Sequence, residues 1–135
     1  MEFGNINVLA VVVSALVAMA VGFLWFSPPL FEKMWLAGIG KTREEVAGQS
    51  PARFLIAFVS ALLESYILAA LLNIVGGPSI GSALQLAFII WVSFVAATSA
   101  ANFAFAGRKL SLWLVENGNH LLVLFVMALI LGAWK

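Results

Sequence analysis

Residues 110–134 read LSLWLVENGNHLLVLFVMALILGAW, a long apolar run that is interrupted once. The interruption is Glu116-Asn117-Gly118-Asn119-His120, which places four polar side chains within five consecutive positions. A helix rises about 1.5 Å per residue, so this run is long enough to cross the roughly 30 Å hydrocarbon core of a bilayer. Polar groups at that depth are costly unless a partner satisfies them. We therefore expect a membrane-spanning helix whose polar face meets other helices.

Composition indicates that the whole chain resides in a membrane. Of its 135 residues, 64% are hydrophobic and only 10% are charged, with a mean hydropathy of +1.10. A soluble domain carries about 25% charged residues. A net charge of +1 and the lack of a basic run give no sign of nucleic-acid binding. With no cysteine and one histidine, disulfides are excluded and a zinc site within one chain is not expected.

Four apolar runs predict an all-α, polytopic four-helix bundle that forms one domain over residues 1–135. The first run is expected to be a retained span, because it continues past a cleavage-like Ala18-Met19-Ala20 and no basic residue precedes it. The predicted spans are residues 6–26, 52–75, 82–106 and 110–134.

The connection between the first two spans predicts short interfacial helices. Pro28-Pro29 ends the first span, and residues 30–37 place apolar side chains at helical spacing, which is typical of an amphipathic helix at the membrane surface. Trp25 and Trp35 are expected to be interfacial aromatic residues. Residues 42–45 carry a capping-box pattern that predicts one more short helix.

The basic residues predict an orientation. Six of them belong to the first and third connections or their edges: Lys33, Lys41, Arg43, Arg53, Arg108 and Lys109. Only Lys135 lies at the other side. The positive-inside rule then places loops 27–51 and 107–109 in the cytoplasm and both termini outside, in what we expect to be a bacterial cytoplasmic (inner) membrane.

The polar residues within the spans are expected to meet in a buried network that forms the ligand-binding site. Glu64 and His120 lie at similar depths, which makes His120 a candidate partner for Glu64. Asn102 and Asn119 are candidate partners for Glu116. Gly118 either permits close helix contact or loosens the fourth helix. The predicted cluster comprises Glu64, Thr98, Asn102, Glu116, Asn117, Asn119 and His120.

One segment resembles the signature of a known family. Residues 24–35, LWFSPPLFEKMW, resemble the end of the first span in the bacterial family catalogued as domain of unknown function 1761. The polar step in the last span and the closing Gly132-Ala133-Trp134 are similar to that family's last helix. The resemblance covers essentially the whole chain. It implies four transmembrane helices and no assigned activity.

Three functional hypotheses follow. The first is a binding or transport module for a small solute, an ion or a proton, with the lipid bilayer as its surroundings. The second is a structural or auxiliary subunit, in which stripes of small residues dock a second copy of the chain or the helices of a larger membrane complex. The third is a lipid-acting membrane enzyme, but no known catalytic spacing, metal motif or cofactor motif is present.

Overall fold

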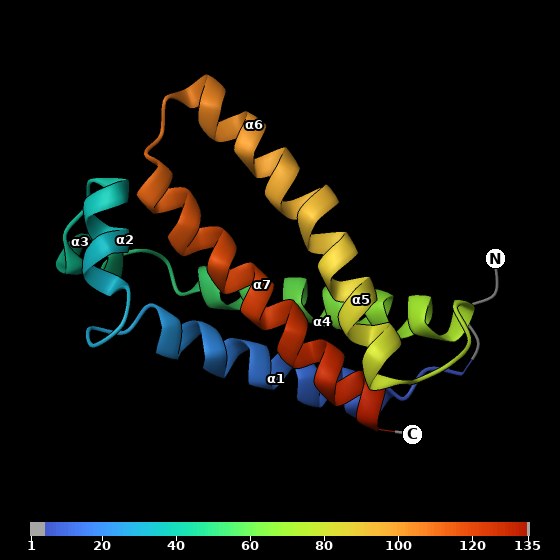
Figure 1. Cartoon of the computed structure of the whole chain (residues 1–135). Helices are drawn as coiled ribbons and strands as arrows, with labels where there is room; N and C mark the ends of the chain where they lie inside the picture. The colour runs from blue at the N-terminus through green and yellow to red at the C-terminus, as the bar shows by residue number, and fades with distance from the viewer. Residues whose placement is uncertain (1–4, 135) are drawn as a thin grey trace.

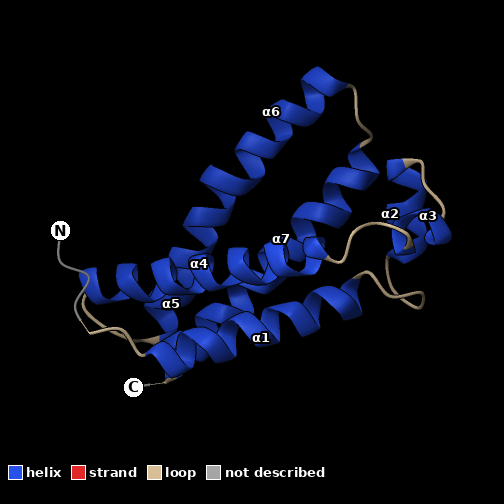
Figure 2. Cartoon of the chain, turned by 180° about the vertical axis from the view of Figure 1, so that it is seen from behind, coloured by secondary structure: helices blue, strands red, loops and turns tan. Residues whose placement is uncertain are grey.

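The computed structural model describes residues 5–134 as helices joined by short connections (Figure 1). No strand occurs within this part of the chain (Figure 2). The four long helices are α1 (Val8–Trp25), α4 (Ala52–Ile74), the segmented third helix α5 (Ile80–Ile90), η1 (Trp91–Ala96) and α6 (Ala97–Ala106), and α7 (Leu110–Ala133). All four are long and apolar enough to cross a membrane, which confirms the predicted all-α, polytopic fold.

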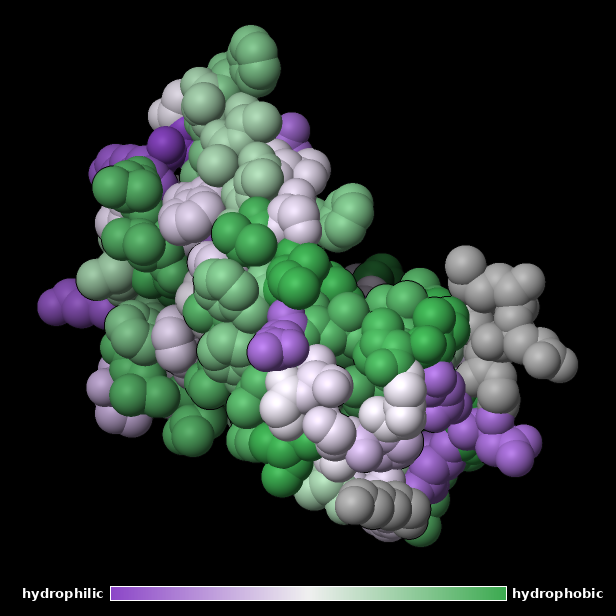
Figure 3. All heavy atoms as spheres, turned by 45° about the vertical axis from the view of Figure 1, so that its right-hand side comes forward, coloured by the Kyte–Doolittle hydropathy of each residue, from purple (hydrophilic) through white to green (hydrophobic). Residues whose placement is uncertain are grey.

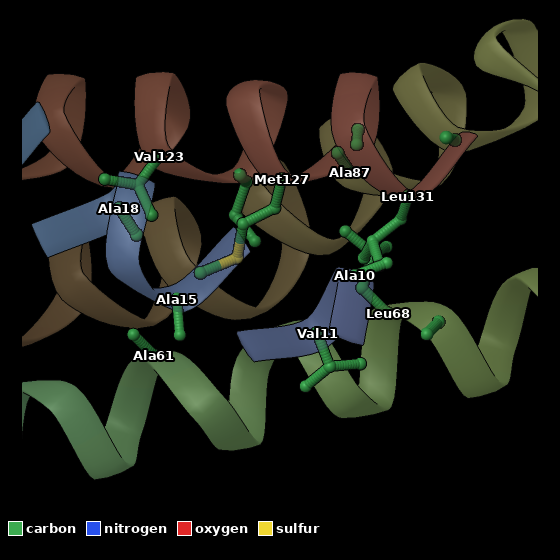
Figure 4. Close-up of a cluster of buried hydrophobic side chains, with 14 of the residues drawn as sticks. Ala10, Val11, Ala15, Ala18, Ala61, Leu68, Ala87, Val123, Met127 and Leu131 are labelled. Carbon is green, nitrogen blue, oxygen red and sulfur yellow. The ribbon is translucent and has the colours of Figure 1, made fainter. Parts of the chain in front are cut away.

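Small side chains bring α1, α4 and α7 together. Ala10, Ser14 and Ala18 recur at every fourth position of α1 and are buried in the core. Around them lie side chains of α4, α5 and α7, among them Leu68 and Met127 (Figure 4). Small residues let the helix backbones approach closely, and dispersion contacts then hold the bundle together in the absence of a hydrophobic driving force. The small-residue stripe of α1 is therefore used within the chain.

Two short helices connect α1 to α4, as the sequence predicted. The first, α2 (Glu32–Ile39), covers most of the expected amphipathic segment 30–37. The second, α3 (Arg43–Ala47), begins with a complete capping box. The Thr42 hydroxyl accepts from the Glu45 amide at 3.1 Å, and the Glu45 carboxylate accepts from the Thr42 amide at 3.4 Å.

The third span differs from the expected continuous helix 82–106. Its middle segment, η1, is a π-helix, and beyond it α6 diverges from α7 in both views of the chain (Figures 1 and 2). Within an apolar stretch of 18 residues of this span, 17% of the residues are buried, whereas 39% are buried in the corresponding stretch of α7. The first half is held tightly, because a Cβ added at Gly132 of α7 would lie 2.7 Å from the Ser79 carbonyl oxygen. The third span therefore packs most closely on α7 through α5, and less closely through η1 and α6.

The two ends of the bundle differ in charge. The end that carries α2, α3 and the 107–109 turn holds the six basic residues named above, while Lys135 lies outside the described residues. The opposite end carries the uncharged turn 75–79. Between the ends the surface is largely hydrophobic, as the space-filling view shows (Figure 3).

Candidate functional site

The divergence of α6 from α7 leaves a cavity of about 540 Å³ that is lined by both apolar and polar side chains. We call it the polar cavity after its polar residues. It runs alongside η1 and α6 as far as Arg108, at the basic end of the bundle. Six of the seven residues predicted for the polar cluster line it: Glu64, Thr98, Asn102, Glu116, Asn117 and His120. Thr98 and Asn102 are one helical turn apart on α6, and Glu116 and His120 are one turn apart on α7, so each pair faces the same space. The seventh predicted residue, Asn119, lies elsewhere.

Asn117 is the buried anchor of this cavity. Its side chain is 2% exposed. The amide nitrogen donates to the Ser99 hydroxyl of α6 at 3.0 Å and to the Trp113 carbonyl of its own helix at 3.0 Å. The first of these bonds joins a side chain of α7 directly to a side chain of α6. Asn117 therefore fixes how far α6 leans away from α7.

Two tryptophans bind the backbone of α7 beside this anchor. The Trp91 indole of η1 donates to the Asn117 carbonyl at 2.9 Å. The Trp25 indole at the end of α1 donates to the Val115 carbonyl at 2.9 Å. Trp25, expected to be an interfacial aromatic, is thus turned inward onto α7.

Gly118 makes the inward position of Trp25 possible. A Cβ at Gly118 would lie 3.1 Å from Cζ2 of the Trp25 ring, which is tighter than ordinary contact. The helix α7 remains continuous through this residue. Of the two roles expected for Gly118, close helix contact is the one the structure contains, and local unwinding is absent.

Glu116 has a partner that the sequence did not suggest. Its carboxylate lies 3.6 Å from the guanidinium of Arg108, with neither Asn102 nor Asn119 bonded to it. The guanidinium also lies over the Phe103 ring, 4.3 Å from its centroid. Arg108 therefore places a positive charge at the end of the cavity and compensates the charge of Glu116.

Glu64 and His120 lie together but do not pair as expected. Both line the cavity, and both also line a second space on the other side, a groove of about 780 Å³ between α1, α4 and α7. Within residues 5–134 neither side chain makes a hydrogen bond or an ion pair. Their polar groups stand where the two spaces meet, accessible from each.

Asn119 and Trp35 belong to the second groove. Asn119 lines it beside His120, and its side-chain oxygen is buried without a hydrogen-bond partner within the described residues. Trp35 lines the far end, where its ring lies 5.1 Å from that of Phe26. The predicted cluster is thus divided between two neighbouring spaces.

The predicted cluster left out three residues that shape the site: Ser99, Arg108 and Trp91. Ser99 follows the predicted Thr98 directly. It lies 18 positions before Asn117, and the tight turn between them makes α6 and α7 antiparallel neighbours, which is the signal that could have identified the pair. Arg108 was used only for orientation. Trp91 gave no signal, because an aromatic residue in an apolar helix is ordinary.

The chemistry available in the cavity is hydrogen bonding and charge. Within residues 5–134 no three histidine, cysteine, aspartate or glutamate side chains come together as a metal site would require. The cavity offers one unpaired carboxylate, one carboxylate paired with arginine, an imidazole and several hydroxyl and amide groups. This set can bind a polar or charged ligand and can exchange protons with it.

Comparisons place the chain in a family without adding an activity. Neither the curated proteins nor the solved structures give a match. Residues 9–132, nearly the whole chain, match the family described as "Protein of unknown function (DUF1761)". The earlier resemblance is therefore confirmed, and this membrane protein belongs to the DUF1761 family.

Proposed function

We propose that the protein is a small integral-membrane binding or transport module for a small solute, an ion or a proton. The observation that carries the proposal is the single cavity shared by Glu64, Thr98, Asn102, Glu116, Asn117 and His120. Ionisable groups within membrane spans are expensive and usually mark ligand or ion pathways.

The contacts of these side chains favour binding over a purely structural role. A network that serves only to join helices satisfies its own polar groups, as Asn117 does. Glu64 has no partner among the described residues, and Thr98 and Asn102 face the cavity with large exposed fractions. Unsatisfied groups that line an accessible space are available to a ligand.

The distribution of charge supports an orientation and a point of entry. Both the cavity and the six basic residues reach the same end of the bundle. By the positive-inside rule this end faces the cytoplasm, so the cavity opens there and both termini lie outside. The membrane is proposed to be a bacterial cytoplasmic membrane.

An alternative role as a structural or auxiliary subunit has one feature in its favour. Ala97 and Ala101 form a small-residue face on α6 that is exposed and lines neither space. A helix of a second copy or of a larger complex fits such a face closely. The corresponding stripe of α1 is buried within the chain and does not contribute to this alternative.

Flux measurements on reconstituted protein test the transport proposal. Proteoliposomes are loaded with a pH indicator or with ion-selective dyes, and proton, Na⁺ and K⁺ fluxes are driven by a potential across the membrane. We expect at least one flux to exceed that of protein-free liposomes. Glu64→Gln and Glu116→Gln, which remove a charge while keeping the shape, are expected to abolish it.

Glu44→Gln is the matched control, because Glu44 lies on the exposed surface of α3 outside both spaces. It is expected to conduct like the wild type. The transport proposal is wrong if no flux exceeds that of empty liposomes, or if both cavity variants conduct as fast as the wild type. Cross-linked dimers together with absent flux would favour the structural alternative.

A further inference from the structure

The second groove is chemically distinct from the polar cavity. Its volume is about 780 Å³, a size typical of pockets that hold drug-sized ligands. Small and aromatic side chains of α1 and α4 form its walls, including Gly22, Phe23, Phe54 and Ala57. The rings of Phe23 and Phe54 pack against each other in this wall, with their centroids 5.7 Å apart. The groove therefore accommodates an apolar, chain-like or ring-bearing group.

The inner end of the groove presents acceptors without donors to match. The carboxylate of Glu64 makes no hydrogen bond or ion pair within residues 5–134. The side-chain oxygen of Asn119 is buried and also lacks a partner. The imidazole of His120 lines the same end of the groove. The buried Asn119 oxygen calls for a hydrogen-bond donor, because an unsatisfied buried acceptor is costly. The unpaired Glu64 carboxylate that lines the same groove favours a donor that carries a positive charge.

The basic side chains at the outer end are already engaged. Arg43 pairs with Glu32 at 3.2 Å, which neutralises both charges. Arg53 donates to the carbonyl oxygens of Gln49 at 2.7 Å and Ser50 at 3.0 Å, and its guanidinium lies 4.3 Å from the centroid of the Phe54 ring. Among the described charged side chains that line the groove, only Glu64 makes no hydrogen bond or ion pair.

We infer that this groove binds an amphiphilic organic cation, with its ammonium group on Glu64 and Asn119 and its apolar portion between α1 and α4. Charge complementarity selects a cation over a neutral or anionic amphiphile. The aromatic walls add cation–π attraction along the path of entry. Glu64 lines both the groove and the cavity of the proposed transport function. The inference rests on that function only through this shared residue.

Equilibrium binding of radiolabelled dodecylammonium tests the inference. The full chain is placed in phosphatidylcholine nanodiscs at neutral pH, and binding to protein-free nanodiscs is subtracted. We expect saturable binding that dodecanol and dodecanoate displace poorly. Glu64→Gln removes the countercharge and is expected to weaken binding about thirtyfold or more.

Gly22→Leu adds bulk to the apolar wall of the groove at a position where an added Cβ meets nothing within 4 Å. It is expected to weaken dodecylammonium binding about tenfold while leaving ion flux unchanged, since Gly22 does not line the polar cavity. Glu44→Gln and Gly81→Leu, which lie outside both spaces, are the controls for charge and bulk and should bind like the wild type. Thermal unfolding of each variant verifies that it is folded.

Three outcomes would overturn the inference: no saturable binding above empty nanodiscs, equal affinity for dodecanol or dodecanoate, or wild-type affinity in both Glu64→Gln and Gly22→Leu. Failure here with Glu116-dependent ion flux intact would remove the groove site and leave the proposed transport function standing. Dodecylammonium binding without any flux would remove the proposed transport function and leave the groove site standing.

Discussion

At the residue scale, a small number of polar side chains have different roles in the site: some join helices, and others face the cavity. Asn117 is satisfied and holds two helices, whereas Glu64 and His120 are unsatisfied and face open space. Glu116 lies between these extremes, paired with Arg108 at the end of the cavity. The same polar stretch of α7 therefore serves both for packing and for binding.

The packing role of Asn117 predicts that its substitution lowers stability, whereas substitution of the exposed Asn102 does not. Asn117→Ala removes two hydrogen bonds and leaves a void, so we expect the free energy of unfolding in detergent to fall by about 1–3 kcal/mol. Asn102→Ala, on the exposed cavity wall, should change it by less than about 0.5 kcal/mol. Equal losses in the two variants, measured by thermal or denaturant unfolding, would contradict the role given to Asn117.

The sequence identified which polar residues gather but not which of them bond. Depth along a helix follows from counting residues, and this brought six predicted residues to one cavity. Pairing depends also on how each helix is rotated and how far it leans. Those variables are set by contacts such as Trp91 on the Asn117 carbonyl, which no local pattern encodes.

At the element scale, α1 and α5 pack on α7, α4 packs mainly on α1, and the third span is divided. Its α5 half is close to α7, while α6 diverges beyond the π-helical turn. The apolar run 82–106 predicted one continuous helix through residues 91–96. Wider π turns are uncommon and are found mainly at functional sites, where tertiary contacts offset their cost. Here the Trp91 indole supplies such a contact, which sequence periodicity could not reveal.

The close contact between α5 and α7 predicts a strong effect at one glycine. A Cβ at Gly132 would lie 2.7 Å from the Ser79 carbonyl oxygen and 2.9 Å from Cα of Ile80, both backbone atoms. Gly132→Ala must therefore move one helix and should lower the free energy of unfolding by about 1–3 kcal/mol.

Gly22→Ala is the matched control, because its Cβ meets no atom within 4 Å and alanine favours the helix by up to about 1 kcal/mol over glycine. It should be neutral or stabilising. Identical unfolding midpoints for the two alanine variants would show that the α5–α7 contact is looser than described here.

At the scale of the whole molecule, four apolar helices enclose two spaces that meet at Glu64 and His120. Hydrophobic composition was sufficient to predict the four spans, whose ends in the structure lie within two residues of those expected. It could not predict the separation of the polar cluster into a cavity and a groove. That separation follows from the lean of α6, a property of the assembled bundle.

If the cavity between α6 and α7 opens at the basic end as proposed, water reaches the cavity wall from that side. Because the chain contains no cysteine, single-cysteine variants report accessibility without background. Asn102→Cys and Thr98→Cys place a thiol on the cavity wall, and Ala101→Cys and Ala97→Cys place one at nearly the same depth on the outer face of α6. Maleimides react with the thiolate, which forms only where water reaches the sulfur.

The most direct measurement is the rate at which a membrane-impermeant maleimide labels these four variants in oriented vesicles. We predict fast labelling of Asn102→Cys and Thr98→Cys from the side that carries Arg108, slow labelling from the opposite side, and little labelling of Ala101→Cys or Ala97→Cys from either. Labelling of the two cavity variants as slow as that of the outer-face pair would contradict the account.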